Sequence, residues 1–258
     1  MISQPIVVKD YTNFNQVREQ VVALGNFDGV HLGHQYIINL TCEIAKSKNL
    51  ECGLITFEPH PAKILASLSN FRIYDVNQKI RILQQFALNK IFLMEFTKRF
   101  SLISAFDFFA EILIEKLKVN HIVVGEDFVF GHNRVGNAGF LQELTSKYNI
   151  GLTQIKRQSV GEENCSSSKI RKYIKEGDFL NASKLLGRNY QITVRISKNV
   201  VILGDICIPC DGTYPAKIIV DNKIYNVTTK IVDNNINILG EDLSNIKEEV
   251  ILEYEMDI

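Results

Sequence analysis

Between residues 21 and 155, short apolar runs alternate with longer segments in which apolar residues recur at steps of three and four. The short runs are typical of buried β-strands, and the stepped segments are typical of amphipathic helices. The predicted strands are Val21–Phe27, Glu51–Phe57, Ile91–Glu95, His121–Gly125 and Gly151–Ile155. The predicted helices are Gly33–Lys48, Asn77–Leu88, Ser104–Leu117 and Phe140–Tyr148. This alternation predicts an α/β fold, in which helices cover both faces of a parallel sheet.

The hydrophobic pattern changes in the last third of the chain. Two more helices are predicted first, Lys169–Lys175 and Phe179–Leu186, each followed by a glycine that can end it. The runs beyond Gly187 are rich in Val, Ile, Thr and Tyr and are separated by Asp and Asn turns. They are Gln191–Ile196, Tyr214–Val220, Lys223–Val232 and Glu249–Glu255. We therefore predict two domains, a Rossmann-like domain at residues 1–188 and a small antiparallel β domain at residues 189–258.

The composition of the chain limits which binding partners and which cellular compartment we expect. The 258 residues carry 29 basic and 29 acidic side chains, so no broad positive charge favours nucleic acid or an anionic membrane surface. The start of the chain lacks a signal-peptide pattern, and no apolar run approaches the roughly 20 residues of a membrane span. The five cysteines are an odd number, which fits reduced thiols in the cytoplasm. Cys207 and Cys210 form a CxxC pair without a second ligand cluster, so we interpret them as incidental rather than redox-active or zinc-binding.

A glycine-rich segment joins the first predicted strand to the first predicted helix. It reads Gly25-Asn26-Phe27-Asp28-Gly29-Val30-His31-Leu32-Gly33-His34. Its glycines allow a tight turn and a close approach to a ligand, while backbone N–H groups and the helix dipole attract anions. His31 and His34 fall at the helix start, so the segment predicts a phosphate site. An ordinary glycine-rich turn remains the alternative at this point.

Two further clusters follow later strands. Phe57-Glu58-Pro59-His60-Pro61 comes after the second strand, and we expect its prolines to prevent a helix and to present Glu58 and His60 on a rigid loop. Gly125-Glu126-Asp127-Phe128-Val129-Phe130-Gly131 follows the fourth strand and could stack a planar ring while offering the Asp127 carboxylate. The alternatives are a solvated histidine and aromatic side chains that belong to the core.

The fourth cluster opens a helix. Ser166, Ser167 and Ser168 precede Lys169 and Arg171, which combines hydroxyls, helix N–H donors and cations in a pattern that suits a polyphosphate. A serine-capped surface helix is the alternative. The chain has no GxxxxGK[ST], GxSxG or HExxH motif. A reaction at a nucleotide α-phosphate, with Mg²⁺ neutralising charge, fits this inventory.

These four clusters occur in the order found in one family, and Leu185-Leu186-Gly187-Arg188 follows them. Over about residues 15–190 the chain resembles the prokaryotic FAD synthetases, the adenylyltransferase part of the bifunctional riboflavin kinase/FMN adenylyltransferase family. Ser168 stands where the family usually has threonine. The resemblance implies that residues 1–188 form a nucleotidyltransferase domain, which converts ATP and FMN to FAD and pyrophosphate with Mg²⁺.

The resemblance also implies roles for individual residues. The catalytic residues would be His31, His34 and Arg171. The ATP-binding residues would be Gly25, Asn26, Phe27, Asp28, Gly33, Ser166, Ser167 and Ser168, and the flavin-binding residues Phe57, His60, Asp127, Phe128 and Phe130. The FMN phosphate itself would attack, so no covalent enzyme intermediate is expected. The metal ligands stay open.

The C-terminal part departs from the family pattern. The family's kinase module resembles a six-stranded β-barrel, and Gly204–Tyr214 is similar to one of its segments. The family's Pro-Thr-Ala-Asn motif is missing from Gln191–Leu203, and the chain ends soon after Glu253. We therefore expect residues 189–258 to form a reduced β-barrel-like domain without riboflavin kinase activity. The alternatives are an enzyme that retains this kinase, a transferase for another phosphorylated acceptor, and a non-catalytic flavin-binding or regulatory protein.

Overall fold

The computed structural model describes residues 4–14, 18–197, 199–202, 204–221, 223–240 and 249–255. The first three residues of the chain, and Lys198 and Leu203 of the stretch without the kinase motif, lie outside the described residues. Contacts divide the chain into two compact units. The first comprises Met1–Phe27, Gly33–Leu68 and Ile80–Ser159, and the second comprises Asp28–Leu32, Ser69–Lys79 and Val160–Ile258. The division into two domains at residue 188 stays a prediction.

The first unit contains a six-stranded parallel sheet in the order β1-β4-β3-β2-β5-β6. Its strands are β1 (Ile6–Val8), β2 (Gln20–Leu24), β3 (Glu51–Glu58), β4 (Lys90–Glu95), β5 (Val119–Gly125) and β6 (Gly151–Ile155). The prediction of a parallel sheet is confirmed, and β2 is buried throughout, as a strand covered on both faces must be. The pattern missed β1 because this edge strand is only three residues long and half exposed.

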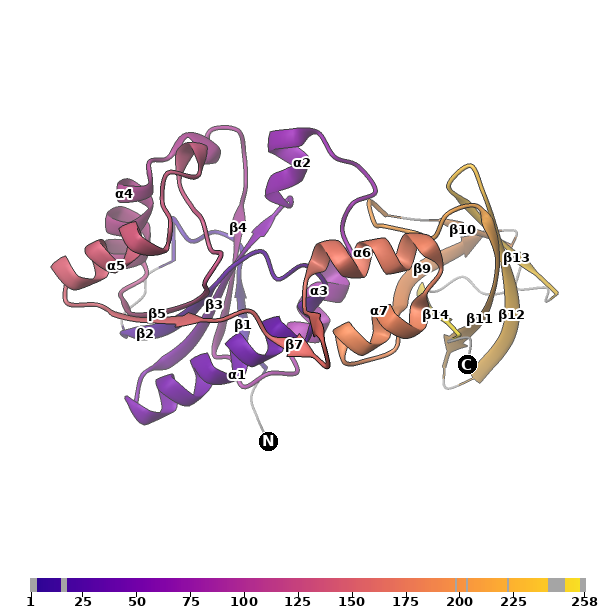
Figure 1. The fold of residues 1–258 in the computed structure, drawn as a ribbon, viewed down its shortest axis with the longest axis horizontal. Helices are drawn as coiled ribbons and strands as arrows, with labels where there is room; N and C mark the ends of the chain where they lie inside the picture. Colours follow the sequence, from indigo (N-terminus) through magenta and orange to yellow (C-terminus); the bar gives the residue numbers. More distant parts are fainter. Residues whose placement is uncertain are drawn as a thin grey trace. The chain divides into compact units, whose positions relative to one another are not determined.

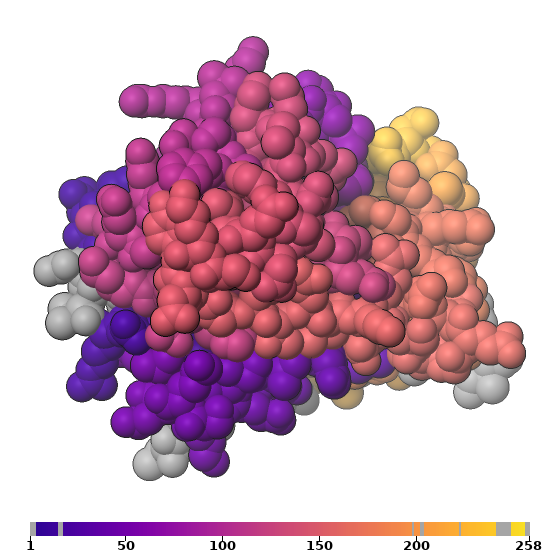
Figure 2. Space-filling model, turned by 60° about the vertical axis from the view of Figure 1, so that its left-hand side comes forward, coloured from indigo at the N-terminus to yellow at the C-terminus, as the bar shows by residue number. Residues whose placement is uncertain are grey.

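Helices cover both faces of this sheet. Val22 and Leu24 of β2 belong to one apolar cluster with η3 (Phe108–Lys116) and α5 (Ala138–Lys147). The neighbouring Val21 and Ala23 point to the opposite face, where Figure 1 shows α1 (Leu32–Ser47). In Figure 2 the magenta and rose atoms of residues that follow β4, including those around α5, form the middle and upper part of the surface turned to the viewer. The predicted helix Ser104–Leu117 starts as α4 (Ala105–Asp107) and continues with the wider π-helical pattern of η3.

One local prediction is wrong. Pro61 does not prevent a helix but begins one, α2 (Pro61–Ala66), and His60 is its N-cap residue. Proline is favoured at the first helical position because the N–H group that it lacks would have no partner within the helix. The predicted helix Asn77–Leu88 is shorter in the structure, as α3 (Val76–Leu83). Short 3₁₀ turns occur at η1 (Asp28–Val30), η2 (Phe100–Leu102) and η4 (His132–Arg134).

The C-terminal part of the second unit contains a pair of helices followed by a barrel. A two-stranded pair, β7 (Ser159–Val160) and β8 (Glu163–Asn164), precedes α6 (Ser167–Glu176) and α7 (Phe179–Leu186). Gly177 and Gly187 end these helices in the left-handed conformation, with φ of 74° and 71°, as the sequence predicts. A closed barrel follows in the order β10-β13-β12-β11-β14-β9. Its strands are β9 (Gln191–Ser197), β10 (Val200–Ile202), β11 (Gly212–Val220), β12 (Lys223–Val232), β13 (Asn235–Leu239) and β14 (Glu249–Tyr254).

The barrel confirms the predicted antiparallel β domain, because all of its strand pairs are antiparallel. Stacked aromatic rings connect the barrel to α7. The ring centres of Phe179 and Tyr254 are 4.4 Å apart, and the ring of Tyr190 stacks on both. All three side chains are almost fully buried. The barrel and α7 therefore share one core. Among the residues described, no helix is both long and apolar enough to cross a membrane.

Candidate active site

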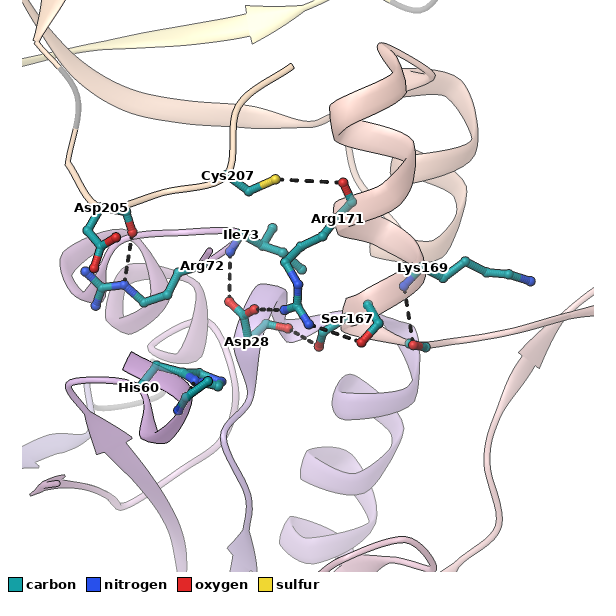
Figure 3. A network of polar contacts seen from close by, with 12 residues as sticks. Asp28, His60, Arg72, Ile73, Ser167, Lys169, Arg171, Asp205 and Cys207 are labelled. Carbon is teal, nitrogen blue, oxygen red and sulfur yellow. Dashed lines mark hydrogen bonds and ion pairs between the residues drawn. The ribbon is translucent and has the colours of Figure 1, made fainter. Parts of the chain in front are cut away.

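Asp28 is the centre of a polar network in the second unit (Figure 3). Its carboxylate accepts hydrogen bonds from Nη1 of Arg171 at 2.5 Å and from the N–H of Ile73 at 2.9 Å. Its main-chain carbonyl accepts a hydrogen bond from Oγ of Ser167 at 2.9 Å. Asp28 is only 5% exposed, and burial raises its pKa while Arg171 acts in the opposite direction. This one residue thus connects the glycine-rich segment to residues 69–79 and to α6.

Arg171 is held from three sides at the start of α6. Besides Asp28, it donates through Nη2 to Oγ of Ser168 at 3.1 Å. Its guanidinium lies 3.9 Å from the ring centre of Phe71, which is cation–π geometry. The hydroxyl of Ser166 caps the helix by accepting a hydrogen bond from the N–H of Lys169. Serine hydroxyls, a helix N-terminus and a fixed guanidinium therefore lie close together, as the sequence predicts for residues 166–171.

The turn that leads into His31 is fixed by Arg188. Its guanidinium donates to the carbonyl of Val30 at 3.0 Å and also to the carbonyl of Gly29. Gly29 has a φ of +79°, and a Cβ atom there would lie 2.7 Å from Ile73. No other residue fits at this position without strain. His31 follows this turn and is 6% exposed.

The two ends of the glycine-rich segment, residues 25–27 and 33–34, belong to the first unit. The N–H of Gly25 donates to the carbonyl of Ile55, and Oγ1 of Thr56 donates to the carbonyl of Asn26 at 2.9 Å. Phe27 is 1% exposed, and its ring meets the ring of His34 edge to face at 5.2 Å. Gly33 is buried in the first turn of α1, so Phe27 and Gly33 support the backbone and the His34 ring from inside the fold.

The aromatic loop after β5 also lies in the first unit. Phe128 stacks on Phe130 with ring centres 5.5 Å apart, and Phe130 in turn packs on Phe108 of η3. Phe130 is buried, whereas Phe128 is half-buried. Asp127 is exposed and pairs with Nη2 of Arg157 at 2.8 Å. Phe128 and Asp127 can therefore meet a ligand, while Phe130 acts as a support beneath them.

Phe57 and His60 follow β3, and each makes a contact within the fold. Phe57 packs against Phe96 and Phe100, with ring centres 5.8 and 5.9 Å away. Nδ1 of His60 accepts a hydrogen bond from the N–H of Ala62 at 3.1 Å, so the His60 ring is oriented by α2. The rigid presentation of His60 that the sequence predicts thus comes from helix capping rather than from a helix-free loop.

The residues that the structure describes gather no group of three or more His, Cys, Asp or Glu side chains that could hold a metal ion. The side-chain carboxylate of Asp28, whose main-chain carbonyl accepts a hydrogen bond from Ser167, is bound to Arg171. Mg²⁺ commonly binds through one or two carboxylates together with substrate phosphates.

The family model for FAD synthetase matches residues 13–169. The chain belongs to the FAD synthetase family. It is 34% identical over 214 residues to a FAD synthetase of Listeria monocytogenes, across 82% of this chain and 85% of that protein. It is 35% identical over 192 residues to a bifunctional riboflavin kinase/FMN adenylyltransferase of Buchnera aphidicola, across 74% of this chain but only 61% of that protein. The chain thus covers about three fifths of that bifunctional relative.

A solved structure shares the fold of this FAD synthetase family member over its whole length. It is named as a macrolide-efflux protein of Streptococcus pneumoniae, covers 100% of this chain and 91% of its own, and has a TM-score of 0.83 at 23% identity. At this identity the likeness shows the fold alone.

Sequence reasoning missed two groups of residues in this FAD synthetase family member. Phe71 and Ile73 contact Arg171 and Asp28, but their segment carries no recognisable motif. Arg188 attracted attention only as part of a family motif, and its position just after a helix-ending glycine was the one local signal. Both groups contact residues far away in the sequence, and hydrophobic periodicity carries no information about such contacts.

Proposed function

We propose that this chain is an FMN adenylyltransferase, which transfers AMP from ATP to FMN and releases pyrophosphate. A phosphate oxygen of FMN attacks the α-phosphorus of ATP, and the bond from that phosphorus to the oxygen bridging to the β-phosphate breaks. The observation that carries the proposal is the Asp28 network, which ties the turn before His31 to the serine-rich start of α6. Transfer of this kind needs positioning and charge stabilisation more than a protein nucleophile.

We assign the phosphate-binding residues the roles that the family resemblance implies, which their chemistry supports. His31 and His34 stabilise charge on the α-phosphate and on the departing pyrophosphate. Ser166, Ser167 and Ser168 bind the β- and γ-phosphates together with Arg171. A guanidinium has five N–H donors, and hydrogen bonds to Asp28 and Ser168 use two of those on Arg171. Arg171 can therefore bind a phosphate without leaving Asp28.

The flavin part of the proposal rests on the loop after β5. Phe128 is half-buried and already stacks on Phe130, so its ring can extend this stack to the flat ring system of FMN. The Asp127 carboxylate is exposed beside it and can accept hydrogen bonds from the polar edge of that ring system. Phe57 and His60 complete the proposed set of flavin-binding residues.

In this proposal Mg²⁺ enters the site only bound to ATP. The described side chains do not gather as a metal site, so we assign it no protein ligands and no step of the reaction. We expect Mg²⁺ to bind the protein in calorimetry only when ATP is present. Binding of Mg²⁺ by the protein alone would contradict this assignment.

The proposed partners are the small molecules ATP and FMN, in the cytoplasm. The balance of 29 basic and 29 acidic residues supports small-molecule rather than nucleic-acid or membrane binding. We also infer that residues 1–188 perform the transfer and that residues 189–258 have no riboflavin kinase activity. The absence of the Pro-Thr-Ala-Asn motif from residues 191–203 supports that loss.

The test measures FAD and pyrophosphate by chromatography after incubation of the protein with FMN, ATP and Mg²⁺. We expect equal amounts of the two products. His31→Ala should reduce FAD formation by about a hundredfold, the lower end of the range for loss of one charge-stabilising group. His121→Gln is the matched control, because His121 lies in the first half of β5, away from the strand ends that lead into the motifs. Absence of FAD with folded protein would contradict the proposal.

A further inference from the structure

Two cysteine thiols meet inside the first unit. Cys42 lies in the second half of α1 and Cys52 lies near the start of β3, and their Sγ atoms are 2.7 Å apart. This is closer than ordinary contact between sulfur atoms that share no bond, and it compares with about 2.0 Å in a disulfide. Both cysteines are free thiols in the structure. Only a small approach of the two side chains separates this contact from a covalent bond.

The backbone around both thiols is well anchored. The N–H of Cys52 donates to Oδ1 of Asn89 at 2.7 Å, and its carbonyl accepts from the N–H of Asn89 at 2.8 Å. The strand that carries Cys52 is hydrogen-bonded on both sides, to β2 and to β4. Cys42 belongs to a helix of 16 residues, and its Sγ also points to the carbonyl of Ala87 at 3.4 Å. The contact therefore follows from the fold rather than from the rotation of one exposed side chain.

The two thiols differ in access and acidity. Cys42 is partly exposed, whereas Cys52 is 3% exposed. The hydrogen bond from Cys52 lowers the pKa of Cys42, and the same bond together with burial raises the pKa of Cys52. A thiolate is the reactive form of cysteine, so Cys42 is the group that an oxidant reaches first.

We propose that Cys42 and Cys52 are an oxidation site at which a peroxide forms a disulfide between α1 and β3. The Cys42 thiolate attacks one peroxide oxygen, the O–O bond breaks, and the product is a sulfenic acid with release of hydroxide, which takes up the proton lost by Cys42. The sulfur of Cys52 then attacks the Cys42 sulfur, the S–O bond breaks, and water leaves with the Cys52 proton. Two thiols and one hydrogen peroxide thus give one disulfide and two waters.

The CxxC pair of the second unit provides the contrast. The sequence draws attention to Cys207 and Cys210, but Sγ of Cys207 donates to the carbonyl of Arg171 at 3.7 Å (Figure 3). Burial also raises the pKa of Cys207 to about 11, which keeps this thiol protonated at neutral pH. The structure therefore favours a pair ten residues apart over the pair that has the familiar spacing.

Mass spectrometry of the full chain tests the proposal. The native protein is treated with hydrogen peroxide, the remaining thiols are blocked with N-ethylmaleimide after unfolding, and the protein is digested. We expect an intact mass lower by two hydrogens before blocking, a linked peptide pair containing Cys42 and Cys52, and reversal by dithiothreitol. Five blocked thiols after treatment, a link between Cys207 and Cys210, or Cys42 recovered as sulfinic acid without a link would each overturn it.

Single substitutions identify the reacting pair. Cys42→Ser should abolish the linked product, because it removes the partly exposed sulfur that reacts first, and Cys52→Ser should do the same. Cys165→Ser is the matched control, since Cys165 is buried like Cys52 but lies in the second unit, and this variant should form the link normally. If Cys52→Ser does not fold, Cys42→Ser decides alone. Formation of an intramolecular disulfide in Cys42→Ser would contradict the assignment.

Discussion

Each of the two units contains an Asp–Arg ion pair, and the two pairs differ in surroundings much more than in length. Asp28 and Arg171 are 2.5 Å apart, with side chains 5% and 13% exposed. Asp127 and Arg157 are 2.8 Å apart, with side chains 67% and 47% exposed. The two pairs thus differ in burial rather than in distance, and we expect the same residue types to have different roles in them. The first pair holds together the backbone around Asp28, and the second is exposed to solvent.

The physical reason is the cost of an unpaired charge. Removing one partner of a buried ion pair leaves the other charge in a medium of low polarity, which costs about 3–5 kcal/mol. An exposed pair contributes roughly 0–1 kcal/mol, because water and salt solvate and screen both charges. We therefore expect Asp28 to be required for folding of the glycine-rich segment, and Asp127 to be replaceable without loss of the fold.

The largest effect is expected from Asp28→Ala. It leaves Arg171 without its carboxylate and removes the acceptor of the Ile73 N–H group, so the free energy of unfolding should fall by about 3 kcal/mol. Urea unfolding of the variant and the native chain measures this. Asp127→Ala is the control of equal size. If Asp28→Ala lowers the free energy of unfolding by less than about 1 kcal/mol, the buried pair contributes no more than an exposed one, and the comparison is wrong.

A smaller effect is expected from Arg188→Ala. The carbonyls of Gly29 and Val30 lose a charged donor, which should cost about 2 kcal/mol of unfolding free energy and lower the rate of FAD formation through a displaced His31. Arg188→Lys keeps the charge and one donor and should recover part of the rate. Turnover is compared where both variants are folded. Equal rates in the native chain and in Arg188→Ala would show that this contact does not position His31.

Asp127→Asn should separate binding from stability. The unfolding free energy should change by less than about 0.5 kcal/mol, because the carboxylate is exposed. The affinity for FMN should fall, since the side chain loses its charge and one acceptor. Titration of FMN fluorescence gives the affinity, with Arg157→Ala as the partner variant. Unchanged FMN affinity would remove Asp127 from the flavin site.

The smallest effect concerns His121, a partly buried polar group that carries no charge at neutral pH. Burial lowers its pKa below the ordinary 6.5, and its Nε2 bonds to Oγ1 of Thr153 at 2.8 Å. The unfolded chain therefore binds a proton more readily, and stability from this group is present above pH 6.5 and is lost as the pH falls below it. The urea midpoint of unfolding should therefore differ less between pH 7.5 and pH 5.5 in His121→Gln than in the native chain. An equal pH dependence in both proteins would show that His121 contributes nothing.

Much of the fold could be predicted because its signals are local. Strands buried on both faces appear as apolar runs, and α6 and α7 are bounded by caps and glycines that lie next to them in sequence. The motifs around His31 and Arg171 could be found in the same way. Pro61 shows the limit: the residue that stops a helix in its interior begins one at the first position, and spacing alone does not distinguish the two.

The side-chain contacts between different elements are the part that could not be predicted. Arg171 reaches Asp28 across 143 positions, and Arg188 reaches Val30 across 158. Cys42 and Cys52 are near in sequence, but a helix and a strand must first fold against each other before their sulfur atoms meet. Such contacts depend on tertiary packing, which hydrophobic periodicity does not encode.

The most direct test of the proposed function is one turnover experiment with two alternative flavins. The folded chain is incubated with ATP and Mg²⁺ and with either FMN or riboflavin, and the products are separated by chromatography. We predict FAD from FMN, and neither FMN nor FAD from riboflavin. If FMN gives no FAD while the protein remains folded, the proposed adenylyl transfer is wrong, and if riboflavin is phosphorylated, the predicted loss of kinase activity is wrong.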